Sequence, residues 1–178
     1  MRVVAGEFGG RRLVAPRGRA TRPTADRVRE ATFSILGSVQ GARVLDLFAG
    51  SGALAIEALS RGALAATLVD TSPAAIAAIK RNLSTVGATA EVLRQPAAAF
   101  LGGARANARQ YDLVFLDPPY QSAGDVGREL SATLIPVLAT DARIVAESDR
   151  RAPLALALSL VQERRYGDTL IRIYHVPP

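Results

Sequence analysis

The chain has 178 residues, which is enough for one compact domain, and with no cysteine and one histidine it offers no disulfide, cysteine nucleophile or metal cluster. Its apolar runs are too short for a membrane span or a secretory signal, so we expect a cytoplasmic protein. We also expect it to bind no metal. The net charge is +6, and the first 29 residues, with eight arginines and two acidic residues, carry an excess of the same size.

The first 40 residues predict a small extension made of a hairpin and a helix. Two short segments, 2–5 and 11–15, flank glycines as hairpin strands would, and a helix is expected from Thr24, a residue type typical of N-caps. The apolar stripe of this helix should pack on the main domain, while Arg27 and Arg29 are expected to point elsewhere.

From residue 41 to 178 the sequence predicts one α/β domain in which strands and helices alternate. The predicted strands are 44–48, 66–70, 91–94, 111–116 and 143–146, and the helices between them are 53–61, 74–86, 97–106 and 126–138. Two further strand-like segments, 156–163 and 169–176, indicate a terminal hairpin. The pattern favours a parallel sheet to which the hairpin adds antiparallel strands.

A glycine turn, Gly50-Ser51-Gly52, joins the first strand of this domain to its helix and lets a ligand approach the backbone and the helix N-terminus. Asp70 ends the next strand, where it can accept hydrogen bonds from ribose hydroxyls. This spacing also satisfies the dinucleotide fingerprint. Asp46 favours S-adenosylmethionine instead, because a carboxylate attracts its cationic amino acid part and gains nothing beside a pyrophosphate.

The sequence Asp117-Pro118-Pro119-Tyr120 directly follows the fourth strand, at the sheet edge where open α/β folds bind ligands. Prolines cannot donate hydrogen bonds, so the Asp117 carboxylate and the Pro118 carbonyl can both accept from one exocyclic amine. Tyr120 can stack on the base that carries this amine. The motif therefore predicts direct methyl transfer to the amino group of a nucleic-acid base, extruded from its stack.

Most of the early arginines suit phosphate contacts from a segment that orders on binding RNA, although a merely solvated terminus is the alternative. The expected RNA contacts are Arg11, Arg12, Arg17, Arg19, Arg22 and Arg27. Deletion of residues 1–20 is then expected to leave cofactor binding nearly normal while abolishing methylation.

Over nearly its whole length the chain resembles the RsmD-type 16S rRNA guanine-N2 methyltransferases, a family of Rossmann-like S-adenosylmethionine-dependent enzymes. The resemblance lies in four stretches: 2–6 with 10–13, Arg22-Pro23-Thr24-Ala25-Asp26-Arg27-Val28-Arg29-Glu30, 46–52 and 117–120. It implies seven strands with an antiparallel last strand, an extension at 1–40 that seats the RNA, and N2-methylguanosine and S-adenosylhomocysteine as products. It also implies a monomer that acts on 16S rRNA within 30S subunits or their assembly intermediates.

In this class an acidic or amide side chain often follows the third strand and contacts the adenine; here Gln95 is the candidate. The expected cofactor residues are Asp46, Phe48, Gly50, Ser51, Gly52, Asp70, Thr71 and Gln95, and the catalytic ones are Asp117, Pro118, Pro119 and Tyr120. The alternatives are methylation of adenine N6 or of a protein glutamine, an RNA-binding module with a vestigial cofactor site and, more remotely, an NAD oxidoreductase.

Overall fold

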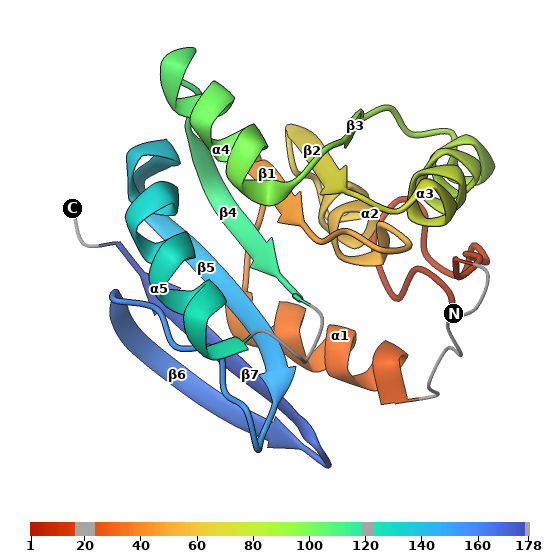
Figure 1. Ribbon diagram of the computed structural model, residues 1–178. Coiled ribbons are helices and arrows are strands. Elements are labelled where there is room, and N and C mark those ends of the chain that lie inside the picture. The colour runs from red at the N-terminus through yellow and green to blue at the C-terminus, as the bar shows by residue number, and fades with distance from the viewer. Residues whose placement is uncertain (17–23, 119–122, 177–178) are drawn as a thin grey trace.

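The computed structural model describes residues 1–16, 24–118 and 123–176 of the chain. Its centre is a seven-stranded sheet in the order β3-β2-β1-β4-β5-β7-β6 (Figure 1). The strands are β1 (Arg43–Leu47), β2 (Ala65–Asp70), β3 (Glu91–Arg94), β4 (Tyr111–Leu116), β5 (Leu138–Asp149), β6 (Ser159–Tyr166) and β7 (Thr169–His175). Strands β1 to β5 run parallel to one another, and β7 is antiparallel to both β5 and β6. The predicted α/β sheet with an antiparallel last strand is therefore confirmed.

Helices cover both faces of the sheet. They are α1 (Thr24–Leu36), α2 (Ala53–Ser60), α3 (Pro73–Val86), α4 (Ala97–Ala106) and α5 (Ala123–Leu134), followed by the 3-10 turn η2 (Ile135–Val137). One core joins buried residues of α1, α2 and α3 to the sheet, and a second core joins those of α4 and α5 to the other face. No helix within the described ranges combines the length and the apolar character that a membrane crossing requires.

The sequence of strand β1 is nearly continuously apolar because helices cover the strand on both faces of the sheet. Val44 belongs to the core of α1–α3, whereas Leu45 and Leu47 belong to the core of α4 and α5. Successive side chains of a strand point to opposite faces, so Asp46 faces the α2 side. A buried carboxylate is thereby placed beneath the start of α2.

The predicted boundaries of three elements in the C-terminal half, α5, β5 and β6, are wrong. The helix predicted at 126–138 gives way at Leu134 to a 3-10 turn, because Pro136 has no N–H to continue the helical ladder. Strand β5 starts at Leu138 and contains a bulge, since Tyr111 pairs with Leu138 while Leu113 pairs with Arg143. Strand β6 begins at Ser159 rather than at 156, because the buried Leu156 precedes it as a loop residue.

Residues 1–16, which we call the arm, are folded onto the domain. Arg2 and Arg12 form the one bridge of the predicted hairpin, and Val3, Phe8 and Leu13 are buried in the same core as α1 and the sheet. The expectation of a segment that orders only on RNA binding is therefore wrong for this part. The arginines at 17, 19 and 22 lie outside the described residues.

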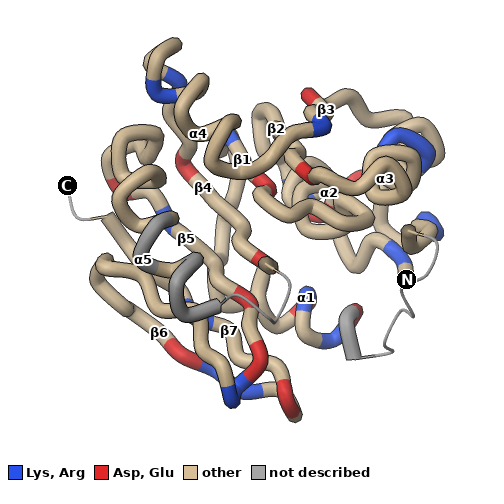
Figure 2. Tube along the Cα trace, in the orientation of Figure 1, with Lys and Arg blue, Asp and Glu red and all other residues tan. Residues whose placement is uncertain are grey.

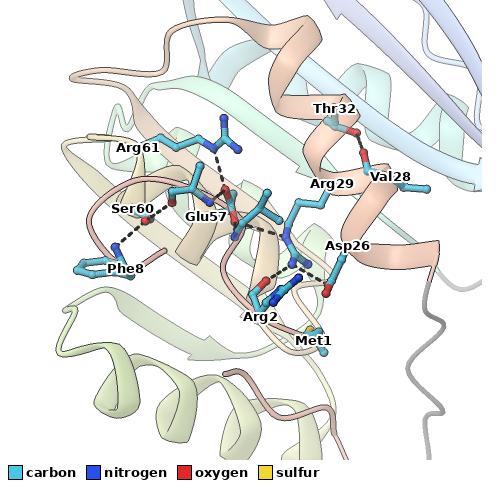
Figure 3. A network of polar contacts seen from close by, with 12 residues as sticks. Met1, Arg2, Phe8, Asp26, Val28, Arg29, Thr32, Glu57, Ser60 and Arg61 are labelled. Atoms are coloured by element: carbon cyan, nitrogen blue, oxygen red, sulfur yellow. Dashed lines mark hydrogen bonds and ion pairs between the residues drawn. The ribbon is translucent and has the colours of Figure 1, made fainter. Parts of the chain in front are cut away.

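A buried carboxylate on α2 anchors the arm and α1 together (Figure 3). Glu57 is fully buried and accepts hydrogen bonds from the backbone N–H groups of Val4 and Ala5, at 2.7 and 3.0 Å. The same carboxylate pairs with the guanidinium groups of Arg29 and Arg61, at 3.5 and 2.8 Å. Arg29 was expected to point away from the domain, but it is 4% exposed, so that prediction is wrong.

Candidate functional site

The loops that follow β1, β2 and β4 lie side by side at one edge of the sheet. Leu47, the last residue of β1, pairs with Val69 on one side and with Leu116 on the other. Because all three strands run in the same direction, Phe48, Asp70 and Asp117 follow at the same edge. The two sequence motifs are thus brought together by adjacent strands.

The glycine turn, Gly50 to Gly52, has a backbone that few residue types can adopt. Phe48, Gly50 and Gly52 have φ values of 70°, 56° and 75°, in the left-handed region that costs a side chain energy. A Cβ added to Gly52 would stand 2.8 Å from Leu68 Cδ2. These constraints place the backbone of the turn and the N-terminus of α2 at the edge, where a helix dipole favours hydrogen-bond acceptors.

Asp46 lies beneath this turn and is 2% exposed. One carboxylate oxygen accepts a hydrogen bond from Ala55 N at 3.3 Å. Its pKa is raised to about 8, mostly by burial and also by the nearby charges of Asp117 and Asp70, while the hydrogen bond from Ala55 N acts in the opposite direction. Three carboxyl groups therefore converge from three strand ends, and a cation bound among them would relieve their mutual repulsion.

Asp70 is held in place by the loops on either side of it. Its carboxylate accepts from Gly50 N at 2.9 Å and from Ser72 N at 2.8 Å, which ties the end of β2 to the glycine turn. A carboxylate has about four lone-pair sites, so capacity remains for ribose hydroxyls. Gln95 follows β3 and donates its backbone N–H to the Asp70 carbonyl at 3.2 Å, while the exposed Thr71 accepts from Arg94 at its carbonyl.

The structure describes only the first half of the Asp-Pro-Pro-Tyr motif. Asp117 is half-buried and Pro118 is buried, directly beyond β4, whereas Pro119 and Tyr120 lie outside the described residues. The ring of Phe115 packs on Phe33 of α1, with 5.7 Å between ring centroids. This contact fixes the strand end that carries Asp117 against α1.

The predicted RNA-contacting arginines differ in their surroundings. Arg11 donates to the Val86 carbonyl and stands over the Phe8 ring at 5.5 Å, so it already has a role in holding the arm. Arg12 and Arg27 are exposed. Figure 2 shows further basic positions on α3, where Lys80 and Arg81 are exposed.

One residue of this site escaped the sequence analysis. Asn82 of α3 is 1% exposed and donates a hydrogen bond to the Ser51 carbonyl of the glycine turn at 2.9 Å. A signal for it exists in the sequence, because Asn82 falls three residues after Ile79 and four before Val86, on the apolar face of the helix. A polar residue at such a position predicts a buried hydrogen-bonding role. Within the described ranges we found no group of three or more potential ligands that could hold a metal ion.

Comparison with known proteins identifies relatives over the whole chain. The family described as "Conserved hypothetical protein 95" matches residues 1–175. The Bacillus subtilis protein named "Putative rRNA methyltransferase YlbH" is 40% identical over 98% of both chains. "Ribosomal RNA small subunit methyltransferase D" of Escherichia coli is 42% identical over 68% of this chain and 61% of its own length. The solved structure described as "Putative methyltransferase yhhF from Escherichia coli" has a TM-score of 0.83 at 35% identity, and the match covers 99% of this chain and 98% of that one.

Proposed function

The chain belongs to the RsmD family of S-adenosylmethionine-dependent rRNA methyltransferases, and from that premise we propose that it methylates the exocyclic N2 of a guanine in 16S rRNA. The observation that carries the proposal is the meeting of Asp46, Asp70 and Asp117 at three neighbouring strand ends. We further propose 30S particles or their assembly intermediates as the substrate, a monomeric enzyme and a cytoplasmic location.

The residues of the edge fit the proposed cofactor. S-adenosylmethionine supplies an electrophilic methyl group and carries positive charge, which suits a site with three converging carboxyl groups. Asp46 and the glycine turn would hold its amino acid part, and Asp70 its ribose. Phe48, Thr71 and Gln95 stand beside these groups and complete the proposed cofactor site.

Asp117 and Pro118 would orient the target amine. The lone pair of an exocyclic amine is delocalised into the base, and two acceptors on its hydrogens favour the pyramidal geometry in which nitrogen attacks. The new N–C bond would form as the S–CH₃ bond breaks, leaving the neutral thioether of S-adenosylhomocysteine. The methylated nitrogen would pass one proton to the Asp117 carboxylate that accepts from it, so no covalent enzyme intermediate is required. In this proposal Tyr120 stacks on the base and Pro119 keeps the loop rigid, and most of the rate comes from alignment.

The proposal is tested by incubating the protein and labelled cofactor with 30S particles, with duplex DNA and with a release-factor-like protein. We expect N2-methylguanosine in the 16S rRNA, at one mapped position. N6-methyladenine in the DNA or a methylated glutamine in the protein would contradict the proposal, and mass spectrometry of the products separates the three outcomes.

Asp117→Ala provides the matching variant. Turnover should fall at least about 100-fold because the amine loses an acceptor, while affinity for S-adenosylhomocysteine stays within about threefold. Asp112→Ala is the control, since this carboxylate lies at the other end of β4 in an exposed ion pair with Arg43. A protein that only binds RNA would show equal, negligible turnover for all three forms.

A further inference from the structure

Asn82 lies between the arm and the glycine turn and bonds to both. Its side-chain amide donates to the Val14 carbonyl at 2.9 Å and its side-chain oxygen accepts from Val14 N at 2.8 Å. The same amide donates to the Ser51 carbonyl at 2.9 Å. One side chain thus satisfies three backbone groups, two of them 68 residues away in sequence and one 31 residues away.

The hydrogen bond to the Ser51 carbonyl helps to set the shape of the glycine turn. The peptide group between Ser51 and Gly52 is planar, so fixing its carbonyl also fixes the direction of its N–H. That N–H donates to the Ala49 carbonyl at 2.7 Å, and the preceding Gly50 N–H is held by Asp70. The peptide planes of the turn are therefore set by Asn82 on one side and by Asp70 on the other.

The two hydrogen bonds to Val14 hold the part of the arm that precedes the arginines at 17, 19 and 22 in sequence. Val14 lies two residues before the end of the described arm, and Arg17, Arg19 and Arg22 come directly after it in sequence. The end of the described arm, at Val14, is consequently held beside the glycine turn. Met1 adds a second contact between arm and turn, because Ser51 Oγ lies 3.5 Å from its sulfur.

We infer that Asn82 is a positioning residue that holds the glycine turn and the end of the arm at Val14 in one arrangement, so that loss of its amide weakens cofactor and RNA binding together. The RNA half of this inference rests on the proposed function. The cofactor half does not, because it concerns a turn that any adenosine-containing ligand of this edge would meet.

The test compares Asn82→Ala with Ser60→Ala. Ser60 is a matched control, since it is 4% exposed and also anchors the arm, accepting from Phe8 N at 2.9 Å and donating to the Ala5 carbonyl at 2.5 Å. Unlike the side-chain hydrogen bonds of Asn82, those of Ser60 to Phe8 and Ala5 reach only the arm. Calorimetric titration with S-adenosylhomocysteine, well below the unfolding temperature of each form, should show a dissociation constant raised about tenfold for Asn82→Ala and unchanged for Ser60→Ala.

In methylation assays with saturating cofactor, Asn82→Ala should also raise the KM for RNA while changing kcat little. Cofactor affinity within twofold of the wild type, or an equal loss in Ser60→Ala, would overturn the inference. A wild type that binds S-adenosylhomocysteine but methylates no RNA would instead refute the proposed function, and the titrations would still decide the role of Asn82.

Asn82→Asp serves if the alanine variant does not fold. Aspartate keeps the acceptor for Val14 N, but when ionised it turns an oxygen toward the Val14 and Ser51 carbonyls. Protonation restores one donor. The loss of cofactor affinity relative to the wild type should therefore be larger at pH 8 than at pH 6, and a loss independent of pH would contradict the inference.

Discussion

At the residue scale, the carboxyl group of Asp46 combines near-complete burial with two acidic neighbours. Its pKa of about 8 means that the free protein holds it mostly protonated at neutral pH. A bound cation favours the carboxylate instead, so cofactor binding should release a proton from this group. The carboxyl group that would attract the ligand therefore lowers the stability of the protein without cofactor at neutral pH.

This cost can be measured through the pH dependence of stability. The pKa of Asp46 is raised from 3.8 in the unfolded reference to about 8, so the folded state binds more protons between these values. Stability from this group is then complete below pH 4 and is lost as the pH rises toward 8. Relative to Asp46→Asn, the wild type should lose roughly 1 kcal/mol per pH unit between pH 5 and 7, and less per unit as the pH approaches 8.

Urea unfolding without cofactor at pH 5, 6, 7 and 8 checks this expectation. Parallel curves for the two proteins would show that Asp46 is ionised throughout. Asp46→Asn should also bind S-adenosylmethionine more weakly than the wild type at pH 8, where the carboxylate is available.

The predictions from sequence also succeed and fail at the scale of single residues. Asp46, Asp70 and Asp117 could be singled out because each ends or interrupts an apolar strand, and adjacent parallel strands then bring them to one edge. The partners of Asn82 and Glu57 in the arm could not be assigned, because they are backbone groups more than 50 residues earlier in sequence. Nothing in the local sequence specifies which backbone groups a buried side chain will meet.

At the scale of elements, the alternation of strands and helices was predictable because buried parallel strands leave apolar runs and their helices leave a 3.6-residue period. Strands β3 and β4 and helix α4 have the predicted boundaries. The irregular parts failed: the bulge in β5 allows a 12-residue strand where only 143–146 was predicted. The bulge depends on tertiary pairing, which the periodic signal does not contain, whereas the end of α5 is set locally by Pro136.

The Glu57 carboxylate of α2 forms a joint with the arm and α1, through its bonds to the arm backbone and to Arg29. Glu57→Gln should therefore destabilise the protein. The substitution leaves the buried guanidinium of Arg29 without its full counter-charge, at a cost of about 3 kcal/mol in the free energy of unfolding. The exposed Glu30→Gln on α1 is the control and should change this free energy by less than about 0.5 kcal/mol. Chemical unfolding of both variants decides, and equal stabilities would show that the charge of Glu57 contributes nothing to holding the arm.

The same joint changes the expected result of deleting residues 1–20. Removal of the arm would uncover apolar core positions and deprive both Glu57 and Asn82 of their backbone partners in the arm. Reduced stability and weaker cofactor binding are now expected together, so point variants are the better test of RNA contacts.

At the scale of the whole molecule, the positive charge lies at one end of the sequence and the remainder is balanced. Replacement of Arg17, Arg19 and Arg22 by alanine should weaken RNA binding and reduce the slope of log K against log salt by about two, because fewer counterions are released. Affinity for S-adenosylhomocysteine should not change. The control is the pair Arg105→Ala and Arg109→Ala, since these exposed arginines precede β4 at the opposite edge of the sheet.

Filter binding at several salt concentrations measures both slopes. If the control pair reduced the slope as much as the triple variant, RNA contacts would be spread over the surface rather than concentrated before α1.

The arm also constrains how the chain can fold during synthesis. Its hydrogen-bond partners at Glu57, Ser60, Asn82 and Val86 lie 52 to 75 residues further along the chain. A polypeptide made from the N-terminus onward exposes Val3, Phe8 and Leu13 well before α3 leaves the ribosome. These apolar side chains remain exposed to solvent during most of that interval. We therefore expect the nascent protein to be most prone to aggregation, and most dependent on a chaperone, before α3 is complete.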